Sequence, residues 1–171
     1  MINLDWEIKK TIQVEKQDLN QIAELKDQHW TYGIESQIDW FINNTESDDI
    51  HIMGFEQNVL KAYLSICTVI AKLDGSIQER LGVGCVCVAS PNEHLGYGKA
   101  LIQKANAIIV SHQKNGILLC RDELCAFYEK CGWFKLHANT IYVADTIYDK
   151  SAMELVNSNW EYNRIDISKN F

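Results

Sequence analysis

Residues 82–98 restrict the possible folds of this chain more than any other stretch. An apolar run of eight residues is followed by a short polar segment and then by Leu95-Gly96-Tyr97-Gly98, which opens an amphipathic helix. A glycine turn between a strand and a helix directs free backbone N–H groups and the positive end of the helix dipole at one point. Glycines also let a phosphate approach the chain closely. The segment therefore predicts an anion-binding loop.

Length and composition favour one globular domain covering residues 1–171, because 47% of the residues are apolar and 23% are charged. The net charge of −7 argues against nucleic-acid binding and is compatible with a cationic amine as partner. The N-terminus lacks a basic start followed by an apolar core, and there is no apolar run of about 18 residues. We therefore expect a cytoplasmic protein that does not enter a membrane.

The six cysteines do not have the spacing of a zinc site or of a redox pair. We interpret them as small buried residues and expect no metal. A catalytic thiol remains an alternative.

The hydrophobic pattern predicts an α+β fold. A capping box at Asp18 and Gln21 marks the start of a first helix, and turns are expected at Gln57-Asn58 and Asp74-Gly75. Strands are expected at residues 6–14, 50–56, 59–71, 77–89, 117–120, 140–144 and, at a sheet edge, 162–167. Further helices are expected at residues 34–42, with Ile34, Ile38, Phe41 and Ile42 on one face, at 97–112, with Leu101, Ala105, Ile108 and Ile109 on one face, and at 124–131 and 151–158. Gly116 and Gly132 are expected to end two of these helices.

Two motifs in this order resemble the GNAT superfamily of N-acetyltransferases. Glu93-His94-Leu95-Gly96-Tyr97-Gly98 occupies the place of the family's Gln/Arg-x-x-Gly-x-Gly/Ala loop, and Phe127-Tyr128-Glu129-Lys130-Cys131-Gly132-Trp133 matches its second signature. The resemblance covers residues 6–133 in element order. It implies a mixed, mostly antiparallel sheet flanked by helices on both faces.

The resemblance also implies acetyl-CoA as co-substrate and assigns residues to it. The coenzyme A pyrophosphate would bind the backbone of His94, Leu95, Gly96, Tyr97 and Gly98, with added charge from Lys99. The pantetheine arm would lie along Val86, Cys87 and Val88, where a backbone N–H polarises the thioester carbonyl. Tyr128 would protonate the leaving thiolate, since an unperturbed tyrosine is protonated at neutral pH. A purely structural Tyr128 is the alternative.

Three residues depart from the family pattern. Glu93 stands where glutamine or arginine is usual, and Gly84 stands where several members carry a glutamate base. Arg121 or Asp122 stands where many members have an asparagine that contacts coenzyme A. The base must then be water or another group, for which the candidates are Glu35, Asp39, Asp48, Asp49 and His51.

A narrower resemblance concerns the acceptor. Three short segments and one tryptophan resemble parts of the aminoglycoside 2′-N-acetyltransferases. They are Asp49-Ile50-His51, Leu60-Lys61-Ala62-Tyr63, Ser151-Ala152-Met153-Glu154-Leu155 and Trp160. Aromatic residues that would line an acceptor site are Trp30, Tyr32, Trp40 and Trp160.

The leading hypothesis is an N-acetyltransferase for a primary amine of a small molecule, with aminoglycosides among the candidates. The alternatives are an acyl-CoA sensor without turnover and acyl transfer through Cys85 or Cys87. A homodimer formed through residues 162–167 is a further expectation.

Overall fold

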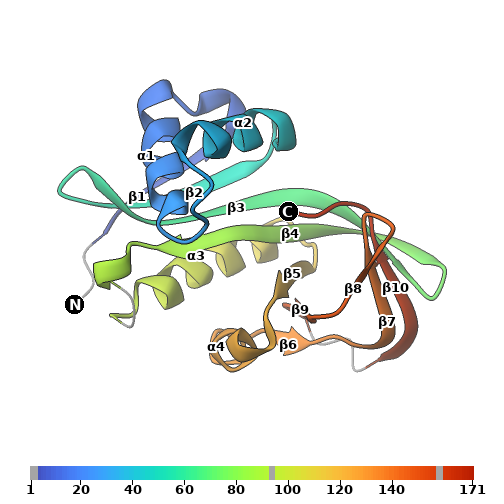
Figure 1. Ribbon diagram of the computed structural model, residues 1–171. Coiled ribbons are helices and arrows are strands. Elements are labelled where there is room, and N and C mark those ends of the chain that lie inside the picture. The colour runs from blue at the N-terminus through green and yellow to red at the C-terminus, as the bar shows by residue number, and fades with distance from the viewer. Residues whose placement is uncertain (1–3, 93–94, 157–159) are drawn as a thin grey trace. The chain divides into compact units, whose positions relative to one another are not determined.

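The computed structural model describes residues 4–92, 95–156 and 160–171, and Figure 1 shows their helices and strands. The chain divides into two compact units. The first comprises Met1–Cys67 and Gly84–Ala105, and the second comprises Thr68–Val83 and Asn106–Phe171. Strands β3 (Val59–Leu73) and β4 (Ser76–Val88) and helix α3 (Tyr97–Ser111) contribute residues to both units. That the chain is one domain stays a prediction.

Three antiparallel strands open the sheet of the first unit. β1 (Asp5–Lys10) pairs with β2 (Ile50–Glu56), and β2 pairs with β3. The turn between β2 and β3 is formed by Gln57 and Asn58, whose φ angles of 51° and 61° belong to a tight hairpin turn. The predicted turn and both strands at it are confirmed. β1 is shorter than predicted, because Thr11–Gln13 form a 3-10 turn.

Helices α1 (Lys16–Asp27) and α2 (Ile34–Asn44) lie on one side of these strands, and α3 lies on the other (Figure 1). The predicted cap of α1 is wrong by three residues. Glu15 is the N-cap, and its amide donates to the Asp18 carboxylate at 2.9 Å. The predicted apolar face of α2 is also wrong in part, because the helix buries Gln37 and Phe41 while Ile42 is 63% exposed.

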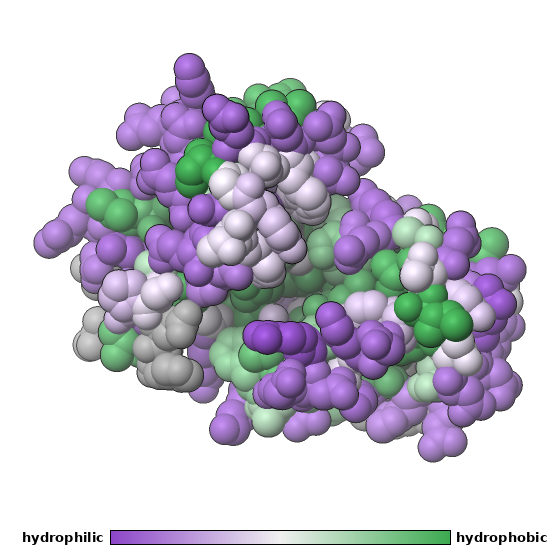
Figure 2. Space-filling model, in the orientation of Figure 1, coloured by the Kyte–Doolittle hydropathy of each residue, from purple (hydrophilic) through white to green (hydrophobic). Residues whose placement is uncertain are grey.

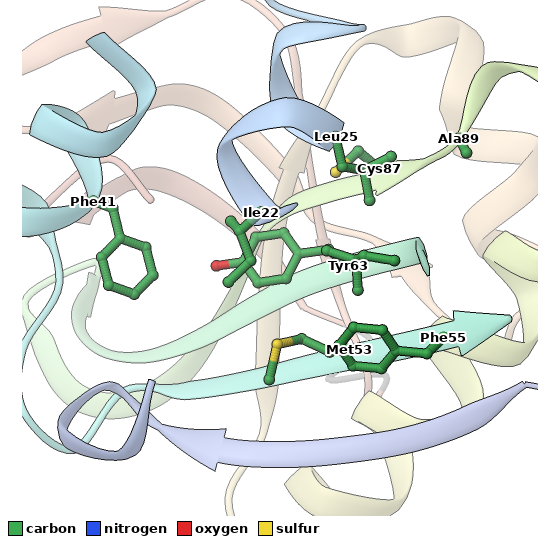
Figure 3. Close-up of a cluster of buried hydrophobic side chains, with 9 residues drawn as sticks. Ile22, Leu25, Phe41, Met53, Phe55, Tyr63, Cys87 and Ala89 are labelled. Atoms are coloured by element: carbon green, nitrogen blue, oxygen red, sulfur yellow. The ribbon is translucent and has the colours of Figure 1, made fainter. Parts of the chain in front are cut away.

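The core of the first unit lies between α1, α2 and strands β2–β4. Figure 3 shows its buried side chains, with the ring of Tyr63 at the centre and its hydroxyl on the side of Phe41. The members are Ile22, Leu25, Phe41, Met53, Phe55, Leu60, Tyr63, Cys87 and Ala89. This cluster fixes α1 against β4, the strand that precedes the predicted anion-binding loop.

The predicted apolar face of α3 is confirmed in large part, although Ile108 is only half-buried. Leu101, Ala105 and Ile109 are fully buried, and Ile102 joins them. The predicted end of the helix is wrong. α3 stops at Ser111 and Gln113 takes the left-handed conformation with φ 54°, whereas Gly116 begins β5 (Gly116–Cys120).

The sheet of the second unit is mixed and mostly antiparallel, in the order β6-β9-β5-β4-β3-β10-β7-β8. Its parallel pairs are β4 with β5, as expected for a strand–helix–strand unit, and β10 with β7. The remaining elements are a 3-10 turn (Asp122–Leu124), α4 (Cys125–Glu129), β6 (Phe134–Lys135), β7 (His137–Val143), β8 (Thr146–Tyr148), β9 (Ser151–Glu154) and β10 (Glu161–Ile167).

Two predictions for the C-terminal part are wrong. Residues 151–154 form strand β9 and not a helix, because they pair with β5 and β6 and are buried throughout. Residues 157–159 of the predicted helix lie outside the described residues. β10 is not an edge strand, since it pairs with β3 on one side and with β7 on the other. Ile165, Asp166 and Ile167 therefore have a strand on each side and are not open for strand pairing with a second copy.

Figure 2 shows hydrophilic side chains over most of one face of the molecule. Within the described ranges, no helix is long and apolar enough to cross a membrane. Of the aromatic residues predicted to line an acceptor site, Tyr32 and Trp160 are largely exposed and Trp30 is 38% exposed.

Candidate functional site

β4 changes its hydrogen bonding after Val83. Its parallel ladder with β5 consists of three pairs and ends at Val83 and Leu118. Two residues further, Cys85 has a φ of 53°, a left-handed conformation that is rare for a residue with a side chain. The two glycines of this strand, Gly82 and Gly84, do not have a positive φ. The left-handed residue is Cys85, and the space at Gly82 is filled by the Phe171 ring, 3.0 Å from the position of a Cβ.

At the end of β4, two residues direct their backbone N–H and C=O groups away from β3. The Ala89 amide donates to the Lys61 carbonyl of β3 at 2.8 Å. Because the backbone groups of a strand alternate in direction, Cys87 faces β3 as well, whereas Val86 and Val88 face the opposite side. The Val88 carbonyl accepts a hydrogen bond from His29 Nε2 at 2.7 Å. Of the three residues predicted to bind pantetheine, Val86 and Val88 direct their backbone groups away from β3, the side on which pantetheine could pair with them.

The N-terminus of α3 carries the predicted anion-binding amides. Gly96 has a φ of 91°, and the first hydrogen bond of the helix runs from the Ala100 amide to the Gly96 carbonyl at 3.1 Å. The amides of Tyr97, Gly98 and Lys99 precede that bond and have no acceptor within the helix. They point along the helix axis, where its dipole favours an anion.

The other loop residues differ in what they can offer. The Leu95 amide already donates to the Asn92 carbonyl at 3.3 Å. Tyr97 buries its ring, and its hydroxyl donates to Glu56 at 2.9 Å, which anchors the start of α3 to the end of β2. Lys99 is exposed in the first turn of α3. Glu93 and His94 lie outside the described residues.

Tyr128 lies in the second unit, on α4, and is 6% exposed. Burial raises the pKa of its hydroxyl well above the ordinary value, and the Cys120 and Cys131 thiols add to this. The group is therefore protonated at neutral pH. Within the parts of the chain that the structure describes, the hydroxyl has no hydrogen-bond partner. The Tyr128 hydroxyl therefore has a proton that it can donate to a bound ligand.

The turn after α4 fixes the backbone at Tyr128. Gly132 has a φ of 90°, and the Trp133 amide returns to the Tyr128 carbonyl at 3.1 Å. The Trp133 indole is buried and donates to Asn106 on α3 at 2.9 Å. The ring of Trp133 also occupies the space beside Gly116, 2.8 Å from where a Cβ would be.

The candidate bases do not supply an exposed, unengaged group beside β4. Asp48 is exposed and pairs with Lys10 at 2.9 Å, and Asp49 accepts the Glu46 amide at 2.9 Å. Glu35 and Asp39 are exposed on α2. Gly84 offers no side chain, and its carbonyl accepts the Ser65 hydroxyl at 3.4 Å.

His51 is fully buried and engaged at both ring nitrogens. Nδ1 lies 2.8 Å from the Tyr63 hydroxyl and Nε2 lies 2.9 Å from Thr11 Oγ1. Burial lowers its pKa to about 4, with a further contribution from the Lys26 ammonium. His51 is therefore a neutral structural residue at pH 7 and a weak base.

The thiols on β4 are poor nucleophiles. Burial raises the pKa of both Cys85 and Cys87, and Cys87 is 4% exposed in the core. A thiol with a raised pKa supplies little thiolate at neutral pH. This argues against acyl transfer through either residue.

One buried residue was missed by the sequence reasoning. Lys26 is 5% exposed on α1, where it follows Ile22 by four residues and so continues the apolar face of the helix. The signal that would have identified it is a lysine at a position where the helical period expects an apolar residue.

Solved structures establish the fold. The chain is similar to Escherichia coli ElaA, with a TM-score of 0.67 at 20% identity over 89% of this chain and 99% of the other. It is similar to an acyl-CoA N-acyltransferase from Pseudomonas aeruginosa, with 0.66 at 17% identity over 90% and 100% of the two chains. It is also similar to an aminoglycoside 6′-N-acetyltransferase in complex with coenzyme A, with a TM-score of 0.63 at 15% identity over 88% of this chain and 98% of the other.

The chain therefore has the fold of the GNAT N-acetyltransferases, as the two motifs predicted. No protein-family model matches the sequence, and no curated protein sequence matches it. The specific resemblance to 2′-N-acetyltransferases stays a prediction.

Proposed function

We propose that this protein is an acetyl-CoA-dependent N-acetyltransferase that acts on a primary amine of a small molecule. The observation that carries the proposal is the joint presence of two features in the first unit. These are the end of β4, where Val86 and Val88 face away from β3 after the left-handed Cys85, and the amides at the start of α3 that precede the first hydrogen bond of the helix. Both belong to a fold whose solved relatives include an enzyme with bound coenzyme A.

The binding roles follow from these directions. The amides of Tyr97, Gly98 and Lys99 bind the pyrophosphate, because a helix N-terminus offers donors and positive potential together. Gly98 keeps the first turn free of a side chain, so that phosphate oxygens reach the backbone. Val86 and Val88 pair with the amide groups of the pantetheine arm as an added strand would.

Tyr128 supplies the proton that the reaction needs at the sulfur. The acceptor nitrogen forms a bond to the acetyl carbon while the carbon–sulfur bond breaks, and the thiolate takes the proton of the Tyr128 hydroxyl. A Val86 or Val88 amide stabilises the negative charge on the carbonyl oxygen. The acceptor ammonium loses one proton before it attacks and a second as the amide forms. Because Gly84 provides no carboxylate, both protons go to water, and the Tyr128 oxygen regains its proton from water.

The test is the release of coenzyme A from acetyl-CoA in the presence of an amine panel. Polyamines, aminoglycosides and amino acids with their amides form the panel, and the rate without amine is the background. We expect release above background with at least one class, together with the acetylated amine by mass spectrometry. Aminoglycosides belong in the panel because the net charge of −7 favours cationic ligands at long range. No release above background with any class contradicts turnover.

A second candidate function is an acyl-CoA sensor without turnover. It is favoured by Gly84, which offers no side-chain base at its own position on β4, and by His51, whose two ring nitrogens are both engaged. Binding of coenzyme A without acetyl transfer to any amine distinguishes the sensor from the enzyme. A homodimer and a cytoplasmic location stay predictions.

A further inference from the structure

β1 forms one edge of the sheet in the first unit. Among the described strands it pairs only with β2, in a register that ends with Lys10 opposite Ile50. The Ile8 side chain in the middle of β1 is 52% exposed. An exposed edge strand presents backbone N–H and C=O groups that a further strand can pair with. The outer side of β1 is therefore a candidate interaction surface.

Two hydrogen bonds show which residues of β1 direct their backbone groups away from β2. The Thr11 amide, directly after β1, donates to the Asp49 carbonyl at 2.9 Å and so faces the β2 side. The Lys10 amide donates instead to Gln13 Oε1 at 2.9 Å and so does not face β2. Because backbone groups alternate in direction along a strand, every second residue before Lys10 also faces outward.

These outward residues are Ile8 and Trp6. Neither amide forms a hydrogen bond with the described residues on this side of the strand. Glu7 and Lys9, in contrast, direct their backbone groups to β2 with the alternation that Thr11 fixes. The Ile8 and Trp6 amides are therefore available to the carbonyls of another strand.

The side chains of β1 show which strand fits. Glu7 and Lys9 lie on one face, where the Lys9 ammonium contacts the Glu7 carboxylate at 2.9 Å and the Asp18 carboxylate at 2.8 Å. Trp6 and Ile8 lie on the opposite face, because side chains alternate along a strand. An acid and a base separated by one exposed apolar residue are complementary to the same sequence in the reverse direction.

We propose that two copies of this chain associate by antiparallel pairing of their β1 strands about a two-fold axis at Ile8. Ile8 then lies opposite Ile8 of the second copy, and the two residues exchange backbone hydrogen bonds. Glu7 lies opposite Lys9 of the second copy, in a pair without backbone hydrogen bonds, where side chains come closest. The Trp6 amide donates to the Lys10 carbonyl of the second copy, which leaves the Lys10 amide bonded as it is.

Charge selects this register over its neighbours. Outward residues pair with outward residues, so the adjacent two-fold axes lie at Glu7 and at Lys9. Each of these places an ionised side chain directly opposite its own copy, which is destabilising. The axis at Ile8 places each acid opposite a base and buries Ile8 against its copy. A two-fold interface of this kind is closed, so that it forms dimers and not fibres.

Sedimentation equilibrium from micromolar to millimolar concentration tests the association. For the natural sequence we expect a monomer–dimer equilibrium. Ile8→Pro removes the amide that donates across the axis, and an edge strand accepts a proline where the N–H faces outward. The dissociation constant of the dimer is expected to rise at least about tenfold, because the hydrogen bonds from the Ile8 amides of both copies are lost.

A matched pair of variants tests the side chain. Ile8→Asp places like charges at the axis and is expected to give monomers. Ile12→Asp is the control, because Ile12 is 72% exposed and lies in the 3-10 turn outside the proposed pairing. It is expected to keep the dissociation constant of the natural sequence. A natural protein that stays monomeric at millimolar concentration overturns the inference, and the lysines of β1 then only protect an edge. A dimer that both Ile8 variants keep also overturns it.

Hydrogen exchange of the natural protein tests the register without any variant. Below the dissociation constant, the Trp6 and Ile8 amides are expected to exchange fast, and the Glu7 and Lys9 amides are expected to be protected by β2. Above it, protection is expected to rise at Trp6 and Ile8 and to change little at Glu7 and Lys9. A dimer that leaves Trp6 and Ile8 unprotected contradicts pairing at β1. None of these measurements uses acetyl-CoA, so that the inference stands or falls independently of the proposed function.

Discussion

Tyr63 and Tyr128 are both buried tyrosines, with 1% and 6% exposure, and one lies in each unit. Burial is the main cause that raises the pKa of each hydroxyl. They differ in what the hydroxyl contacts. Tyr63 lies 2.8 Å from His51 Nδ1, whereas Tyr128 has no hydrogen-bond partner in the described ranges. The Tyr63 hydroxyl is satisfied within the fold. The Tyr128 hydroxyl is not among the fully buried atoms that lack a partner, since Arg80 Nε is the one such atom of the described residues, so that a ligand can reach it.

The network around Tyr63 shows how the first unit satisfies its buried polar groups. His51 accepts from Tyr63 at Nδ1 and donates from Nε2 to Thr11, whose hydroxyl faces the Asp49 carbonyl at 3.5 Å. The rings of His51 and Tyr63 are stacked, with centroids 6.0 Å apart. Each member is uncharged at pH 7, so that the network contributes to stability without ionising. Tyr128 has no such network and depends on its backbone turn for its position.

The largest expected effect is that of Tyr128→Phe on turnover. The variant removes the proton donor for the thiolate, and kcat is expected to fall by about 10- to 100-fold. The dissociation constant of coenzyme A and the free energy of unfolding are expected to stay within experimental error, since the hydroxyl makes no hydrogen bond in the described structure. Steady-state kinetics and calorimetry measure both quantities. An unchanged kcat assigns Tyr128 a structural role, like that of Tyr63.

The next effect concerns the pH dependence of stability. The pKa of His51 is about 4 in the folded protein and about 6.5 when exposed, so the unfolded chain binds the proton first as the pH falls. The contribution of neutral His51 is complete above pH 6.5 and is lost as the pH falls towards 4. Between pH 7 and pH 5 the loss is about 2 kcal/mol.

Urea unfolding at pH 7, 6 and 5 measures this loss. His51→Gln is the control, because an amide donates and accepts hydrogen bonds without titrating in this range. The difference in pH slope between the two proteins isolates His51. Identical slopes are incompatible with a buried neutral histidine.

Tyr63→Phe is expected to have the opposite profile to Tyr128→Phe. It leaves His51 Nδ1 buried without its donor, which costs about 1–2 kcal/mol in the free energy of unfolding. At pH 7, kcat is expected to change by less than about twofold, because Tyr63 makes no contact with the reacting groups. If Tyr63→Phe reduces kcat as strongly as Tyr128→Phe, the distinction between the two tyrosines is wrong.

The smallest effect is that of Gly132→Ala. Gly132 has a φ of 90°, and no atom lies within 4 Å of an added Cβ, so that the cost is purely conformational. The free energy of unfolding is expected to fall by about 1 kcal/mol. If this turn sets the position of Tyr128, kcat falls while coenzyme A affinity does not. A variant with normal kcat shows that Tyr128 is positioned by packing alone.

The sequence predicted the β2–β3–β4 meander well, because alternating apolar residues and the Gln57-Asn58 turn are local signals. It also predicted the turn at Gly132 and the start of α3. It failed at residues 151–154, where Ala152, Met153 and Glu154 favour a helix. That segment becomes strand β9 because its neighbours are β5 and β6, and no local pattern reports such a pairing.

For the candidate site, local motifs led to the residues that are proposed to act through the backbone or through a side chain, namely the α3 amides and Tyr128, and their roles stay predictions. They did not identify the partners of His51, since Thr11 and Tyr63 are 40 and 12 residues away along the chain. Nor did they place the left-handed residue of β4 at Cys85, whose conformation comes from the surrounding sheet and not from its own preference.

Titration of coenzyme A into the protein and into Gly98→Asp tests the central claim most directly. The added carboxylate at the start of α3 suits the helix dipole and leaves the fold intact, but it repels a pyrophosphate at the α3 amides. We predict saturable binding by calorimetry for the natural sequence and at least about tenfold weaker binding for Gly98→Asp, at an unchanged unfolding temperature. No heat of binding for the natural sequence, or equal affinity for the two proteins, would contradict the account.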